Sequence, residues 1–161
     1  GGPRPQSDMH LTQGVEAAGM LRGAFPDAGS MTPTELLAAY EAQLRETIEA
    51  VGSERVGEET GLDPELLAAI RSGDSPRIEL TDAAAILATD PDRPAADAIA
   101  AEARDILLLG MTTAVLDVDG LASAIGDALE PKEIQQKVEG RQPMSLREYA
   151  LLHQELAASG A

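Results

Sequence analysis

Apolar residues recur at helical spacing along most of the chain, and short polar breaks divide them into segments. The first segment shows this most clearly. Thr32 precedes Pro33, Glu35 follows, and apolar side chains then recur every three or four residues up to Gly52. A hydroxyl cap, a proline at the first helical position and an acid in the first turn are typical of a helix N-terminus. The pattern therefore predicts a helix over residues 33–51.

The same periodicity predicts seven further helices and no strand. Their expected N-terminal caps include Thr81, Asp119 and Ser145, and Asp63-Pro64 and Glu130-Pro131 open two others. Alanine and leucine, which are strong helix formers, dominate the apolar residues, while aromatics make up only 2%. The chain is therefore expected to be all-α. The helices are expected near residues 53–60, 64–72, 81–87, 95–115, 121–125, 131–139 and 145–156.

Proline and aspartate at residues 90–94 mark the clearest internal boundary. We therefore expect two helical units, at residues 20–90 and 91–161. Residues 1–19 are polar, glycine-rich and aperiodic, and they are interpreted as a disordered tail or an artificial remnant of cloning, with Met20 as a candidate native start.

The two units share an ordered set of features, which becomes visible when Gly61 is set against Gly126. Each glycine is followed by an apolar residue, an acid–proline pair, a short helix with apolar residues four apart, and a glycine with a proline three positions later. A capped amphipathic helix then completes each copy. The sequence therefore predicts an internal duplication.

Each copy resembles the phage-repressor (Cro-like) helix-turn-helix, over residues 53–87 and 119–156. The resemblance implies tandem helix-turn-helix units joined by long helices. It also implies that the helix after each turn, at residues 64–72 and 131–139, is a recognition helix that enters the major groove of DNA.

The second recognition helix has the composition expected for DNA contact. Residues 131–147 hold four basic and two acidic side chains within a strongly acidic chain. Glutamine pairs well with adenine, and lysine or arginine with guanine or phosphate. Lys132 and Arg147 are expected on phosphates. The predicted DNA-binding residues are Lys132, Gln135, Gln136, Lys137, Arg141 and Arg147.

Two other interpretations remain open. The glutamines and lysines of the second copy could be the solvated face of a surface helix. The first copy presents Glu65, Ala68, Ala69 and Arg71, which offer little to base edges, so it is interpreted as a structural remnant. The alternative function is therefore a protein-interaction or scaffold module that binds no DNA. The apolar stripe over residues 106–111 is expected to be core or, alternatively, a homodimer seam.

The net charge of −16, with acid spread along the chain and only two lysines, is typical of proteins from salt-accumulating archaea. In molar salt the Debye length falls to about 3 Å, so the acid no longer excludes DNA. Four stretches, at residues 20–23, 25–29, 102–108 and 130–141, resemble an uncharacterised family of small acidic haloarchaeal proteins. This resemblance implies an archaeal origin and carries no activity.

Other chemistry is scarce. The absence of cysteine excludes disulfides and thiolate zinc sites. His10 and His153 stand alone, and His153 is expected at the surface or half-buried. No phosphate loop, nucleophile elbow or Glu-x-x-His pair occurs. We therefore expect a cytoplasmic DNA-binding regulator that is not an enzyme, has no cofactor, catalytic residue or metal site, and acts on no membrane or small-molecule substrate.

Overall fold

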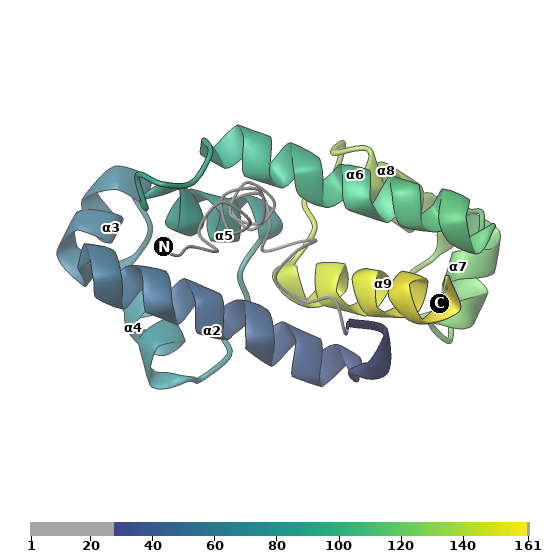
Figure 1. Cartoon of the computed structure of the whole chain (residues 1–161), viewed down its shortest axis with the longest axis horizontal. Coiled ribbons are helices and arrows are strands. Elements are labelled where there is room, and N and C mark those ends of the chain that lie inside the picture. The colour runs from purple at the N-terminus through teal and green to yellow at the C-terminus, as the bar shows by residue number, and fades with distance from the viewer. Residues whose placement is uncertain (1–27, 161) are drawn as a thin grey trace, which may run out of the picture.

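A computed structural model of the chain describes residues 28–160, and within this range the fold is all-α, as the periodicity predicted (Figure 1). Residues 1–19 and the start of the first predicted unit lie outside the described residues. The described elements are η1 (Ala28–Ser30), α2 (Pro33–Val51), α3 (Ser53–Thr60), α4 (Pro64–Ser72), α5 (Leu80–Ala88), α6 (Ala96–Ala114), α7 (Val118–Ala124), α8 (Pro131–Val138) and α9 (Leu146–Ser159).

Local signals set most helix starts correctly. The side chains of Thr32 and Ser145 each accept a hydrogen bond from the backbone N–H three residues later. In turn, the carboxylates of Glu35 and Glu148 accept from the backbone N–H groups of Thr32 and Ser145. Asp63 caps α4, with its carboxylate accepting from the N–H of Glu65. These capping boxes satisfy amides that have no partner within the helix.

Two predicted caps were wrong. Asp117, rather than Asp119, caps α7 and accepts from the N–H of Gly120 at 2.8 Å. Thr81 lies inside the first turn of α5, which begins at Leu80 after Glu79. The physical reason for the second error is tertiary: the N–H of Leu80 donates to the carbonyl of Met144, so another part of the chain satisfies this helix end.

The two halves of the described chain have the same order of helices. A 19-residue helix, α2 or α6, is followed by two short helices, an extended segment and a final helix, α5 or α9. Gly61 and Gly126, which separate the two short helices of each half, adopt positive φ angles of 73° and 69°. Glycine reaches this region without steric cost, so both turns bend the chain in the same left-handed conformation.

The two halves pack against each other through long helices, and they do not form two separate bodies. The long helix α2 lies along α9 of the second half, and α6 lies along α5 of the first (Figure 1). One hydrophobic core includes Leu44 and Leu87 as well as Leu121 and Leu152. The boundary expected at residues 90–94 falls in the connection between α5 and α6, and the two segments that it separates share this core.

An antiparallel bridge joins the halves at the start of their last helices. Glu79 pairs with Ser145. The N–H of Leu80 donates to Met144 O at 2.7 Å, and the N–H of Leu146 donates to Ile78 O at 2.8 Å. The contact is reciprocal, because each half supplies one donor and one acceptor from matching positions. The N-termini of α5 and α9 therefore meet at one place.

Candidate nucleic-acid interface

Helix α8 presents part of the predicted DNA-binding set to solvent. Glu130 precedes Pro131 at its start, and Ile134 and Val138 anchor it in the core. With that stripe buried, Lys132 and Gln135 are exposed and Gln136 is partly exposed. These three side chains lie where a ligand in solution can reach them.

Lys137 is placed differently from the other residues of the set, because it is 7% exposed. Its Nζ donates to Glu148 Oε2 at 2.6 Å and lies 3.4 Å from Glu133 Oε2. The sequence interpretation treated Lys137 as a solvated contact residue. In the fold its ammonium group instead joins α8 to α9, and little of it remains for a phosphate.

The environment of Glu148 favours the charged form of its carboxyl and so favours the ion pair with Lys137. Burial by itself raises the pKa of the Glu148 carboxyl, but the hydrogen bonds from Lys137 and from the backbone N–H of Ser145, together with the positive charges of Lys137 and Arg77, lower it below its usual value. The carboxylate is therefore charged at neutral pH and remains the partner of Lys137.

The two arginines of the predicted set differ from each other. Arg141 is exposed, but its guanidinium lies 2.6 Å from Glu139 Oε1, and Glu139 also accepts from Gln135 at 3.3 Å. Arg147, on the first turn of α9, is exposed and makes no ion pair or side-chain hydrogen bond with another residue in 28–160. Lys132 and Arg147 are therefore the members of the predicted set whose cationic groups pair with no acid among the described residues.

The corresponding face of α4 offers little for recognition. Glu65 and Ala68 are exposed, Ala69 is partly exposed, and Arg71 is exposed near the C-terminal end. No amide side chain lies on this helix, whose sequence is PELLAAIRS. The sequence had given α4 the same assessment.

A buried polar cluster was missed in the sequence. His153 is 9% exposed, and Tyr40 on α2 hydrogen-bonds its Nδ1. Burial, and then the neighbouring Tyr149 hydroxyl, raise the pKa of Tyr40 well above its ordinary value, so Tyr40 keeps its proton and donates. Burial lowers the pKa of His153 to about 4, which leaves a neutral ring as the acceptor. The signal that could have found this cluster is helical spacing, since His153 lies four residues after Tyr149 and three before Leu156, both of which are buried.

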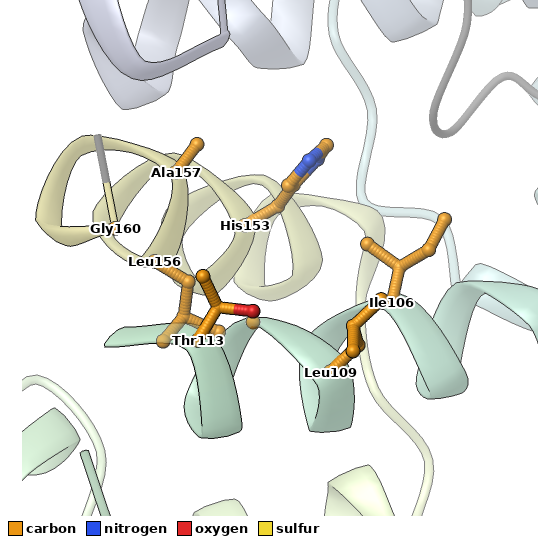
Figure 2. A pocket seen from close by; sticks show the side chains of 8 residues that line it. Ile106, Leu109, Thr113, His153, Leu156, Ala157 and Gly160 are labelled. Atoms are coloured by element: carbon orange, nitrogen blue, oxygen red, sulfur yellow. The ribbon is translucent and has the colours of Figure 1, made fainter. Parts of the chain in front are cut away.

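Three large apolar side chains in the C-terminal half of α6 and at its C-cap are exposed. Leu108 and Leu109 are 45% and 56% exposed, and Val115 is 87% exposed. Leu109 also lines a groove of about 250 Å³ between α6 and α9 (Figure 2). Leu107 of the same stripe is fully buried, so residues 106–111 divide between the core and the surface.

Among the described residues no single helix is long and apolar enough to cross a membrane, although the sharply bent pair α6 and α7 passes the same length and composition criteria when taken together.

These features define an all-α protein whose two four-helix halves share one core. The chain belongs to DUF5791, a family of unknown function, which it matches over residues 36–159. No curated protein and no solved structure matches the chain.

Proposed function

We propose that this chain is a helix-turn-helix protein that binds duplex DNA through its second half, as a transcription regulator in the salt-rich cytoplasm of an archaeon. The single observation that carries the proposal is the exposed face of α8, where Lys132, Gln135 and Gln136 stand free of the core. An amide side chain can bond the edge of adenine with two hydrogen bonds, and a lysine can reach guanine or phosphate.

The geometry around the two turns supports this proposal. The α3–Gly61–α4 and α7–Gly126–α8 segments each place two short helices about a glycine with positive φ. In a helix-turn-helix the second of two such helices enters the major groove with its N-terminal residues against the bases. Lys132 stands in the first turn of α8, at the end that such an entry would bring nearest to DNA.

The acidity of the chain limits the conditions under which binding is expected. A net charge of −16 repels DNA at low ionic strength. At about 1 M salt the screening length is about 3 Å, so only groups in direct contact with the DNA influence the affinity. Binding is therefore expected to survive in molar KCl, where most DNA-binding proteins release their sites.

Fluorescence anisotropy with random and genomic duplexes, from about 0.1 to about 3 M KCl, tests the proposal. Gln135→Ala with Lys132→Gln should weaken binding about tenfold or more, because a bidentate base contact contributes about 1–3 kcal/mol. Arg71→Gln is the matched control, since it removes an exposed positive charge from α4 of the other half. Absence of binding by the unaltered chain at every salt concentration would end the proposal.

A second candidate, a protein-interaction or scaffold module, is favoured by the exposed apolar residues of α6. Leu108 and Leu109 are adjacent in its C-terminal half, and Val115 is the exposed residue that ends the helix. Exposed apolar patches of this kind mark protein contacts. Light scattering tests whether the partner is a second copy: Leu109→Glu should convert a dimer to a monomer, while Ala98→Glu, three turns away on α6, should leave the dimer intact. A chain that is monomeric from the outset would count against this self-association.

A further inference from the structure

A small hollow lies beside the bridge that joins the two halves, and an arginine from each half borders it. Arg77 comes from the segment before α5, and Arg147 comes from the first turn of α9. The hollow has a volume of about 80 Å³, and Pro76 and Ser145 also line it. Only the tertiary structure brings these two arginines to one hollow, since the residues lie in different halves.

Both arginines are exposed, and neither makes an ion pair or a side-chain hydrogen bond with another residue in 28–160. Some cations of the described chain pair with acids: Arg55 with Glu59, Arg93 with Asp90, and Arg141 with Glu139. Within residues 28–160, Arg45, Arg71, Arg104 and Lys132 also form no ion pair. The full sequence has 28 acidic and 12 basic residues, so acids are plentiful. Arg77 and Arg147 are two of these unpaired cations, and they come from different halves to border the same small hollow.

Two helix N-termini add to the positive potential here. Helices α5 and α9 both begin at the Glu79–Ser145 bridge. Each N-terminus carries about half a positive charge from the aligned peptide dipoles. The first amides are already used, because the N–H groups of Leu80 and Leu146 donate across the bridge and that of Glu148 donates to Ser145 Oγ. The helices thus contribute a field, while the arginines contribute the free donors.

Acidic groups also lie in and near the hollow, and two of them have side-chain hydrogen-bond partners. Glu41 lines it but is 9% exposed, and its carboxylate accepts from Ser75 Oγ at 2.6 Å. Glu148 is bonded to Lys137, and the positive charge of Arg77 also acts on its carboxylate. Glu79 lies in the bridge, and Asp82 lies one turn into α5. The interior of the hollow is therefore unsuited to an anion, whereas its arginine-lined rim can hold one from outside.

We infer that Arg77 and Arg147 together bind one phosphate group of the DNA backbone at the junction of the two halves. Guanidinium groups suit this role because their planar N–H donors match the oxygens of a phosphate. The inference rests on the proposed function and extends it. It assigns a DNA contact to the first half, through Arg77, although α4 of that half offers no base-reading side chain.

The test compares Arg77→Gln and Arg147→Gln with Arg55→Gln, an equal loss of charge at an exposed position on α3. Each of the first two variants should weaken DNA binding about fivefold on every sequence, and should reduce the slope of log affinity against log salt by about 1. Arg55→Gln should change neither quantity. Unfolding temperatures should stay the same, because both arginines are exposed. DNA binding by Arg77→Gln equal to that by Arg55→Gln overturns the inference and leaves the proposed function in place.

Inorganic phosphate provides the second arm. One outcome is that the unaltered chain binds no duplex at any salt concentration and yet is stabilised by phosphate, while the Arg77→Gln/Arg147→Gln double variant is not stabilised. In that case the two arginines bind free phosphate. The proposed function and the assignment of the phosphate to DNA then fail, while the phosphate site stands. If neither DNA nor phosphate distinguishes the double variant from Arg55→Gln, the site itself is refuted.

Discussion

Lys137 on α8 and Glu148 on α9 form a largely buried ion pair, with 2.6 Å between Nζ and Oε2. Glu148 also closes the capping box of α9 with Ser145, the residue that bridges to Glu79. One lysine thus connects the candidate recognition helix to the junction of the two halves. Its position suggests that it orients α8 rather than contacting a ligand.

Replacing Lys137 by methionine is expected to lower the free energy of unfolding by about 2 kcal/mol, because Glu148 would be left with its charge partly buried and without this donor. Urea unfolding at neutral pH measures the loss. Lys132→Met, on the exposed side of the same helix, should change stability by less than about 0.5 kcal/mol. Equal effects of the two substitutions would show that the buried pair contributes nothing.

The pH dependence of stability should report the Tyr40–His153 contact. The unfolded chain protonates this histidine near its ordinary pKa of 6.5, whereas the folded chain does so only near about 4. Between these values the unfolded state binds more protons, so stability falls as the pH falls, by about 3 kcal/mol in all.

His153→Asn can still accept from Tyr40 but does not titrate in this range. Its stability at neutral pH should be lower, because the smaller side chain fills the site less well. Its decline between pH 6.5 and pH 4 should be smaller than that of the unaltered chain. Identical pH profiles from urea unfolding would show that His153 is not responsible for the acid sensitivity.

Val115 ends α6 in the left-handed region, with φ at 56°, and its side chain is 87% exposed. At the matching end of α2 the chain has Gly52. A β-branched residue is strained in this conformation, so Val115→Gly should raise the free energy of unfolding by about 1 kcal/mol. Ala101→Gly, within the same helix, should lower it by about 1 kcal/mol. Chemical denaturation of both variants gives the comparison, and a loss of stability in Val115→Gly would contradict the strain.

The charge of −16 predicts that stability increases with salt, because like charges crowd together in the folded state. The unfolding temperature should rise with KCl until the Debye length is shorter than the distances between surface acids. Reversing two exposed acids of α2, Glu46→Lys with Glu49→Lys, should make this rise shallower. An unfolding temperature that is independent of KCl would show that self-repulsion is not limiting.

The sequence by itself determined the helices and most of their ends, because periodicity, proline at the first position and capping boxes such as Thr32 with Glu35 act within four or five residues. It also identified the exposed face of Lys132 and Gln135, since the stripe of Ile134 and Val138 fixes which side of α8 is buried.

Only the tertiary structure decided the features that join distant segments. The ion pair of Lys137 depends on Glu148 across the turn between α8 and α9, and the hydrogen bond of His153 depends on Tyr40 on α2. Helix α5 begins at Leu80 and not after a Thr81 cap, because the backbone carbonyl of Met144 accepts a hydrogen bond from the N–H of Leu80. Arg77 and Arg147 line one hollow because two segments far apart in the chain pair with each other. The hydrophobic periodicity of either segment does not predict this pairing.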